Sequence, residues 1–286
     1  MRLDLFKEQV AEAGKPLQPT GERSYLGLSG WHDCQRNLYH KAKGTPRKPI
    51  ESRIYRIFKQ GHDIEDQTVN LLKQVPNILI EEVDPETGKQ FEVQFFGGHI
   101  KGHFDFRCRS EYYFGETTRK LGEIKSANDK NFKMYQKKGV QQTNETYYAQ
   151  VQCYMHGTQN NEHWKDHALT QCLFIVFNKN TAELYIEMID YNKAEAEHYL
   201  ECFKNALQAP ELPEKYSDNP TFYICRFCDF AEYCHKDKSI ELEKIKQCKH
   251  IQPNMTSGNW FCTKTDCEFY KQQVGGLTEK CQSISQ

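Results

Sequence analysis

Three closely spaced cysteines constrain this sequence more than any other feature. Cys225, Cys228 and Cys234 form the pattern C-x2-C-x5-C, and thiols so close together are poor core residues. The N-terminal residues lack the apolar core of a signal peptide, so we expect a cytoplasmic protein. In a reducing compartment, clustered cysteines bind metal and scattered ones are buried. A fourth ligand would be either Cys248, shortly downstream, or Cys34, far upstream.

Composition places the chain among globular proteins. It has 286 residues, of which 27% are charged and 38% hydrophobic, which fits one large domain or two small ones. The longest strongly apolar stretch, 172–177, is too short to span a bilayer, so we expect no membrane partner. The formal net charge is −1, with 38 Lys and Arg against 39 Asp and Glu. This average does not exclude a local basic groove.

Hydrophobic periodicity predicts a chain that contains both helices and strands, as in an α/β fold. Steps of three and four residues predict helices at 29–39, 52–75, 143–156 and 193–208. Short runs rich in β-branched and aromatic residues predict strands at 77–83, 90–96, 99–108, 120–127, 171–177 and 182–189. We interpret the first four strands as a β-meander.

Two of these strands carry polar residues that packing does not require. One contains the letters GHFD, ending at Asp105, and the other contains GEIKS, with Glu123 and Lys125. Residues two apart on a strand share a face, so Ile124 would point into the core on the opposite side. Two carboxylates can hold Mg²⁺ or Mn²⁺, and a lysine beside them can orient or deprotonate a metal-bound water and stabilise phosphoryl charge. Taken alone, an E-x-K pattern also fits a solvated ion pair.

The pair GHFD and GEIKS resembles the P-D-(D/E)-x-K nuclease superfamily, specifically its RecB-type branch. The resemblance implies an α/β fold with a mixed central β-sheet flanked by helices, which is a restriction-endonuclease-like core. In this core Asp105, Glu123 and the Ile124 carbonyl would bind metal, and Lys125 would be the catalytic lysine. The residue before Asp105 is Phe104 rather than proline, a departure that is common within the branch.

Two helical motifs add to the resemblance. Gly61-His62 fits the branch's upstream histidine, which implies that His62 is a metal ligand. Gln150 and Tyr154 fit its Gln-x3-Tyr helix, in which the glutamine helps to position the active site and the tyrosine lies near DNA. Taken alone, the two residues also fit ordinary helix packing. Glu65 and Asp66, one turn beyond His62, could contact the metal ligands, but we favour a solvated helix face.

The same resemblance indicates which of the two candidate cysteines is the fourth metal ligand. Iron–sulfur nucleases of this branch, such as AddB and the nucleases of CRISPR spacer acquisition, use one cysteine before the nuclease core and three after it. The implied ligands of a structural [4Fe–4S] cluster are therefore Cys34, Cys225, Cys228 and Cys234. Zinc held by the same four thiolates is the alternative.

Beyond the resemblance lies a cysteine-rich C-terminal appendage. It could hold Zn²⁺ through a nearest set of four ligands, namely Cys248, His250, Cys262 and Cys267. The alternative is a tail of cysteines without a ligand. Such an appendage could bind DNA or a protein partner. We divide the chain into an N-terminal helix or arm at 1–19, a nuclease domain at 20–235 and the appendage at 236–286.

Two basic stretches flank the candidate site. Residues 36–59 contain eight Lys or Arg against one acidic residue, and residues 119–138 contain seven against two. Such local excess suits phosphate binding, although a charge run is also compatible with a solvated face. Tyr135, Tyr147 and Tyr148 could stack on single-stranded bases or pack in the core.

These observations predict a divalent-metal-dependent deoxyribonuclease. The resemblance favours an exonuclease at single-stranded or duplex DNA ends, in recombination, repair or phage DNA processing in a prokaryotic or phage-infected cell. An endonuclease that nicks or processes branched DNA is one alternative, and a catalytically silent DNA- or protein-binding scaffold is another. The oligomeric state and the strand polarity do not follow from the sequence.

Overall fold

The computed structural model describes residues 9, 25–48, 50–159, 164, 168–236, 248, 250–265 and 273–274. Within these ranges the chain forms two compact units. The first comprises residues 50–92 and 103–192, and the second comprises residues 25–48, 93–102 and those from 193 onward. The predicted arm at 1–19 lies outside the described residues apart from residue 9, and the appendage at 236–286 is described in part. None of the helices in the described ranges has the length and apolar character needed to cross a membrane.

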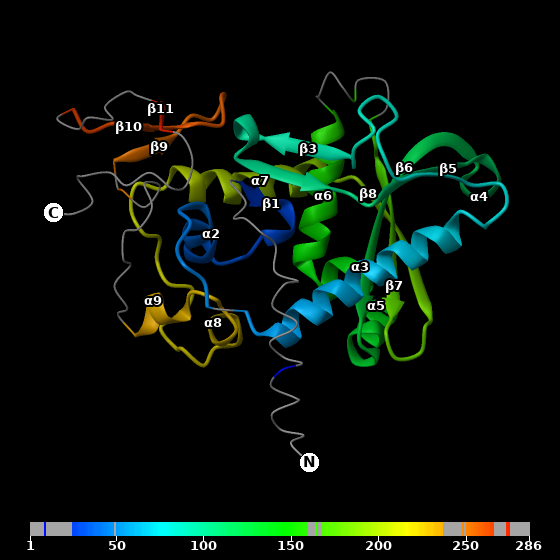
Figure 1. Ribbon diagram of the computed structural model, residues 1–286, viewed down its shortest axis with the longest axis horizontal. Coiled ribbons are helices and arrows are strands. Elements are labelled where there is room, and N and C mark those ends of the chain that lie inside the picture. The colour runs from blue at the N-terminus through cyan, green and yellow to red at the C-terminus, as the bar shows by residue number, and fades with distance from the viewer. Residues whose placement is uncertain are drawn as a thin grey trace, which may run out of the picture. The chain divides into compact units, whose positions relative to one another are not determined.

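A five-stranded mixed sheet forms the centre of the first unit (Figure 1). In spatial order its strands are β2 (Leu79–Glu81), β5 (Phe106–Ser110), β6 (Glu116–Ala127), β7 (Gln171–Asn178) and β8 (Leu184–Asp190). The central strand β6 runs antiparallel to β5 and parallel to β7. Two helices, α5 (Asp129–Thr143) and α6 (Glu145–Gln159), make the crossover that a parallel pair requires. The predicted mixed sheet with flanking helices is confirmed.

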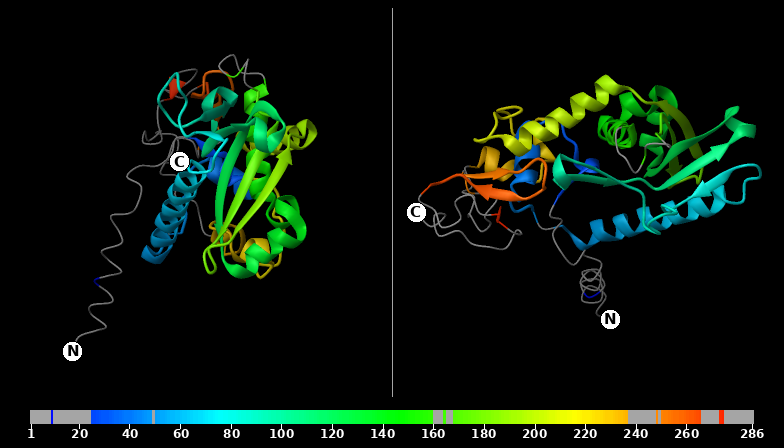
Figure 2. Two further views of the ribbon diagram at one scale, coloured as in Figure 1. Left: turned by 90° about the vertical axis from the view of Figure 1, so that its right-hand side faces the viewer. Right: turned by 90° about the horizontal axis from the view of Figure 1, so that it is seen from above.

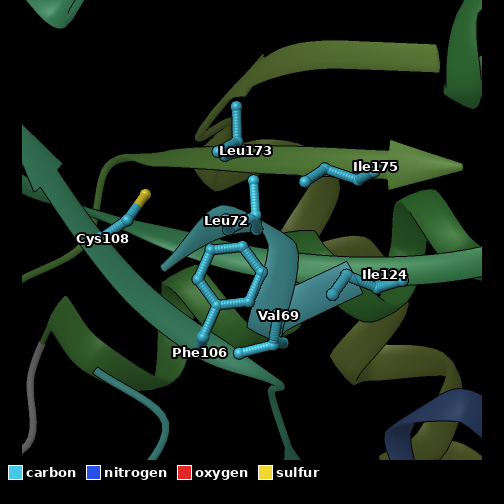
Figure 3. Packing of buried hydrophobic residues seen from close by; sticks show 7 residues of the cluster. All are labelled: Val69, Leu72, Phe106, Cys108, Ile124, Leu173 and Ile175. Atoms are coloured by element: carbon cyan, nitrogen blue, oxygen red, sulfur yellow. The ribbon is translucent and has the colours of Figure 1, made fainter. Parts of the chain in front are cut away.

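One face of this sheet is covered by α3 (Ser52–Leu72). Val69 and Leu72, one turn apart near the end of α3, pack on a cluster of alternate strand residues (Figure 3). The strand members of the cluster are Phe106, Cys108, Ile124, Leu173 and Ile175. Because strand side chains alternate between faces, these residues reach one side together. Their burial fixes the register of β6 and therefore the face on which its polar residues lie.

The opposite face of the sheet carries the polar residues of β6. Glu123 pairs in register with Phe174 of β7, so the two side chains share this face. The ring of Tyr147, on α6, lies 6.4 Å from the ring of Phe174 between centroids. Consequently α6 and α3 pack on opposite faces, and Figure 2 shows α3 and the crossover helices on the two sides of the sheet.

Gly122 of β6 provides a test of this packing. It pairs with Phe106 of β5, and a Cβ at position 122 would overlap the Phe106 ring. We expect Gly122→Ala to reduce the free energy of unfolding by about 1–3 kcal/mol, as measured by urea denaturation. Gly61→Ala is the matched control. Its Cβ would meet no atom within 4 Å, and alanine in a helix is expected to stabilise by up to about 1 kcal/mol. Equal stability of the two variants would contradict the close Gly122–Phe106 contact.

The predicted meander is wrong in one respect. Strands β3 (Glu92–Phe95) and β4 (Ile100–His103) do not join the five-stranded sheet, because they belong to a separate sheet with β1 (Leu26–Gly27), in the order β1-β4-β3. The predicted strand at 99–108 is interrupted at 104–105, and β5 begins at Phe106. At this interruption the Asp105 side chain contacts the backbone of β6, because its carboxylate accepts a hydrogen bond from the Ile124 N–H.

The second unit combines that small sheet with helices and a C-terminal sheet. Helix α2 (Gln35–Ala42) packs on α7 (Lys193–Gln208), and the nearby rings of Trp31 and Tyr199 meet edge-on at 4.9 Å. The remaining elements are the short helices α8 (Tyr223–Arg226) and α9 (Ala231–His235) and the antiparallel strands β9 (Ile251–Pro253), β10 (Trp260–Cys262) and β11 (Gln273–Val274). Cys34 immediately precedes α2, while α8 and α9 contain Cys225 and Cys234.

Candidate functional site

Strand β6 presents a buried carboxylate and an ammonium group on one face. Glu123 is 1% exposed, and its Oε1 atom pairs with Nζ of Lys125, two residues along the strand. The Lys125 Nζ also lies 5.2 Å from the centre of the Tyr147 ring on α6. Ile124 points the other way and is buried in the core beneath α3 (Figure 3). The structure therefore has the alternation of polar and apolar residues that the spacing predicts.

Asp105 lies directly beside this pair. It precedes β5, whose first residue Phe106 pairs with Gly122, so Asp105 stands next to Glu123 across the two strands. Its Oδ2 atom accepts a hydrogen bond of 2.7 Å from the Ile124 backbone N–H. This bond connects the turn before β5 to β6. The three strand residues of the predicted constellation are thus brought together by sheet pairing.

Helix α3 contributes a fourth charged residue, Glu65, for which a solvated helix face is the favoured prediction from the sequence. The side chains of Glu65 and Asp105 share a hydrogen bond. His62, one turn earlier, has a side chain that is 75% exposed and lies 3.8 Å from Glu65, between Nδ1 and Oε2. The helix therefore directs Glu65, rather than His62, toward the strand carboxylates. A sequence signal existed, because Glu65 lies at helical spacing from the buried Val69 and Leu72.

Electrostatics favour a cation at this position. Burial, followed by the charge of Asp105, raises the pKa of Glu65 to about 7 and that of Glu123 to about 8. Burial also raises the pKa of Asp105, although Lys125 and the Ile124 N–H oppose the change. For Lys125, the carboxylates of Glu123 and Asp105 outweigh burial and raise the pKa. Three carboxyl groups thus surround one ammonium group and retain protons to a higher pH than usual, and a divalent cation would favour their charged forms instead.

Residues that could bind such a cation are present, although they are not arranged around a single point. Within the described residues, no group of three or more His, Cys, Asp or Glu side chains has metal-ligating geometry. The Lys125 ammonium group forms an ion pair with the Glu123 carboxylate. The Asp105 carboxylate is hydrogen-bonded to the Glu65 side chain and to the Ile124 N–H. However, the buried Oε2 atom of Glu123 has no hydrogen-bond partner among the described residues. Buried oxygens of this kind require a partner, and carboxylates are the donors that Mg²⁺ and Mn²⁺ prefer, so the residues fit a hard divalent ion.

Gln150 and Tyr154 lie beneath the site on α6. The Tyr154 hydroxyl donates a hydrogen bond of 2.7 Å to the His103 carbonyl and accepts one of 2.6 Å from Gln150 Nε2. Tyr154 is 2% exposed, so its ring is part of the core. This placement differs from the DNA-facing position that the resemblance implied. Instead, the two residues support the backbone two positions before Asp105.

The four cysteines of the predicted cluster line one cavity in the second unit. This cavity has a volume of about 20 Å³, and it is bordered by Cys34, Cys225, Cys228 and Cys234. The ten described cysteines are all free thiols. Burial raises the pKa of Cys225, and the neighbouring Cys34 and Cys228 raise it further. The thiols are thus close enough to influence one another, although they also lack metal-ligating geometry as placed.

Hydrogen-bond donors and positive charge surround these thiols. The Sγ atom of Cys228 accepts hydrogen bonds from Asn37 Nδ2 at 3.2 Å and from the Phe230 N–H at 3.4 Å. Arg36 contributes a hydrogen bond to Cys234. Such donors stabilise thiolates, which are the form that binds metal. The cavity therefore has the donor chemistry of a thiolate metal site.

No protein-family model and no curated protein matches the sequence. Among solved structures, the fold is similar to the crystal structure of SSO0001, with a TM-score of 0.44 and 15% identity over 82% of this chain and 98% of that chain. It is also similar to an alkaline exonuclease, LHK-Exo, from Laribacter hongkongensis, with a TM-score of 0.39 and 13% identity over 64% of this chain and 86% of that chain. A structure of LHK-Exo in complex with dAMP gives a TM-score of 0.39 and 12% identity over the same shares.

The appendage ligands are described only in part. Cys248 and Cys262 are buried. The backbone carbonyl of His250 accepts a hydrogen bond of 2.9 Å from the Thr263 N–H. Cys267 lies outside the described residues. The predicted zinc site therefore stays a prediction.

Part of the positive charge of residues 119–138 is neutralised within the protein. Arg119 pairs with Glu81, and the buried Lys120 pairs with Glu116. Of the three tyrosines, Tyr135 and Tyr148 are buried, and Tyr147 is the one that contacts Lys125. The exposed cations of the second basic stretch are concentrated on α5, and they are Lys130, Lys133, Lys137 and Lys138.

Proposed function

We propose that this chain is a divalent-metal-dependent deoxyribonuclease. The supporting observation is that Glu123 and Lys125 of β6 lie beside Asp105, which in turn contacts Glu65 of α3. One buried carboxylate oxygen of Glu123 has no hydrogen-bond partner in the part of the chain that the structure describes. An ordinary structural ion pair would not need three carboxylates around one lysine. The arrangement provides hard oxygen ligands and a fixed positive charge, which are the two requirements of phosphodiester hydrolysis.

Each residue has a distinct part in the proposed mechanism. Asp105, Glu123 and Glu65 would hold the divalent ion, with the Ile124 carbonyl as a further ligand carried over from the family resemblance. When bound, the ion would supply a more acidic water and neutralise charge on the phosphate. Because its pKa is raised, Lys125 remains an ammonium group, which can orient the nucleophile and stabilise the charge that develops on the phosphoryl oxygens. Tyr154 and Gln150 position the turn that carries Asp105.

We also infer that Cys34, Cys225, Cys228 and Cys234 hold one structural metal group, with a [4Fe–4S] cluster favoured over zinc. Their common cavity and the N–H donors to Cys228 support this assignment. Cys34 precedes α2, and the other three follow α7, so the group would connect segments of the second unit that are distant in sequence. Nothing in phosphodiester hydrolysis requires electron transfer, so the proposed role is structural.

The test of the nuclease proposal is cleavage of end-labelled linear DNA, single-stranded and duplex, with Mg²⁺ or Mn²⁺ and with chelator. We expect metal-dependent release of short products from linear ends, whereas a covalently closed circle stays intact. Glu123→Ala, purified in parallel, controls for contaminating nucleases. Cleavage of the circle would favour the endonuclease alternative. Absence of cleavage under every condition, with DNA binding retained, would favour the binding-scaffold alternative.

A further inference from the structure

Helix α2 contributes more than one thiol-facing group to the cysteine cavity. Asn37, His40 and Lys41 follow Cys34 at spacings that place them along one side of the helix. Asn37 and His40 border the cavity together with the four cysteines. Asn37 already donates to Cys228 Sγ at 3.2 Å. His40 lies in the same wall, one turn further along the helix.

His40 is fully buried, and its orientation is fixed on several sides. The ring is 0% exposed and stacks on Phe230, with 5.0 Å between centroids and 24° between planes. Its Nδ1 atom lies 3.0 Å from the hydroxyl of Thr45. The Thr45 backbone N–H donates to the His40 carbonyl at 2.9 Å, which holds the hydroxyl beside the ring. The imidazole can therefore neither turn away from the cavity wall nor exchange its partner freely.

The other ring nitrogen, Nε2, is buried without a hydrogen-bond partner among the described residues. Thr45 is also buried, so its hydroxyl proton needs an acceptor, and Nδ1 is the acceptor in contact. A neutral ring that accepts at Nδ1 carries its proton on Nε2. Buried N–H groups are almost always paired in native proteins. In a cavity bordered by four cysteines, the natural partner of this proton is sulfur.

We propose that His40 donates an Nε2–H hydrogen bond to a sulfur of the metal group held by the four cysteines. His40 is then a positioning and tuning residue, and Thr45 fixes the tautomer that makes it a donor. The inference rests on the proposed iron–sulfur site and goes beyond its four ligands. Hydrogen bonds to the sulfurs stabilise the more negative, reduced form of a cluster and so raise its reduction potential.

The test is anaerobic reconstitution of the full chain with Fe²⁺ and sulfide, followed by iron content and midpoint potential. His40→Phe keeps an aromatic ring against Phe230 but has no donor. We expect normal iron content and about a tenfold change in the ratio of oxidised to reduced cluster at a fixed potential, which for one electron is about 59 mV toward more negative values. His40→Gln, which keeps a side-chain N–H, should recover part of the shift. His198→Phe, on the exposed side of α7, is the matched control and should change nothing.

Two further outcomes separate this inference from the site on which it rests. A wild-type chain that takes up zinc but no iron and sulfide would overturn both the cluster assignment and the role of His40. A wild-type cluster whose potential is unchanged by His40→Phe would overturn the role of His40 alone. If His40→Phe does not fold, Thr45→Val tests the same point. It leaves the ring in place and should shift the potential in the same direction, and an unchanged potential would contradict the proposal.

Discussion

Replacing Lys125 by methionine is expected to reduce DNA cleavage by about 10²–10³-fold while leaving DNA binding largely intact. The Lys125 ammonium pairs with Glu123 and lies over the Tyr147 ring, so it is held at the carboxylates rather than at the surface. Its positive charge would act on the reacting phosphate and contribute little to holding the rest of the strand. Initial rates on end-labelled DNA, with binding followed by fluorescence anisotropy in chelator, measure the two effects separately.

The controls for this variant address folding and charge. Loss of Lys125 leaves Glu123 buried without its partner, but the raised pKa of Glu123 allows that carboxyl to take up a proton instead of remaining an unpaired charge. Circular dichroism and thermal unfolding should therefore show a folded protein. Lys193→Met removes the same charge from an exposed position on α7, where Lys193 pairs with Glu197, and should keep full activity. Full activity of Lys125→Met would instead contradict the role of Lys125 in cleavage.

Local patterns predict how polar and apolar residues alternate on β6. The alternation of Glu123, Ile124 and Lys125 depends on the two-residue period of a strand, and the apolar Ile124 settles which face is buried. Because β5 and β6 are neighbours in the sequence as well as in the sheet, the approach of Asp105 to Glu123 also follows from short-range pairing.

Long-range packing was harder to predict. Glu65 shares a helix stripe with Val69 and Leu72, but helical periodicity cannot say whether a polar residue on that stripe meets solvent or another carboxylate. The placement of β3 and β4 in a separate sheet is likewise a matter of pairing with β1, which is distant in sequence. In both cases the placement depends on a contact with residues that are distant in sequence, and a local hydrophobic pattern does not report such contacts.

Helix α5 was not predicted because its sequence resembles a charged loop. Asp129–Thr143 is rich in lysine and contains Gly139 at a φ of +74°, where the helix is kinked. Only Phe132, Tyr135 and Val140 are buried, so the apolar stripe is narrow and interrupted by the kink. The helix is completed by Glu187 of β8, whose carboxylate accepts a hydrogen bond of 2.8 Å from the Val140 N–H just after the kink.

Glu65→Gln is expected to impair cleavage far more than His62→Ala, by about 10²-fold in the first case. The reason is geometric, because Glu65 contacts Asp105 whereas the His62 side chain is largely exposed. Asp66→Asn, which removes an exposed acid from the next position of α3, is the matched control and should retain activity. If Glu65 holds the ion, thermal stabilisation by Mn²⁺ should also decrease in Glu65→Gln. At about 100 times Kd, a bound ion contributes about 2.7 kcal/mol in the wild type. A larger loss in His62→Ala would restore the histidine as the metal ligand.

The contact between Glu65 and Asp105 can also be tested in the metal-free protein, through the pH dependence of its free energy of unfolding. The pKa of Glu65 is raised to about 7, above the value of about 4.3 expected for an unfolded chain. A raised pKa means that the folded state binds the proton more tightly, so the resulting stability is fully present below pH 4 and is lost as the pH rises through 7. Glu65→Gln has no such proton to lose. In chelator, its free energy of unfolding should therefore fall less than that of the wild type between pH 5 and pH 8. Parallel pH profiles for the two proteins would mean that Glu65 is solvated, as the sequence alone had suggested.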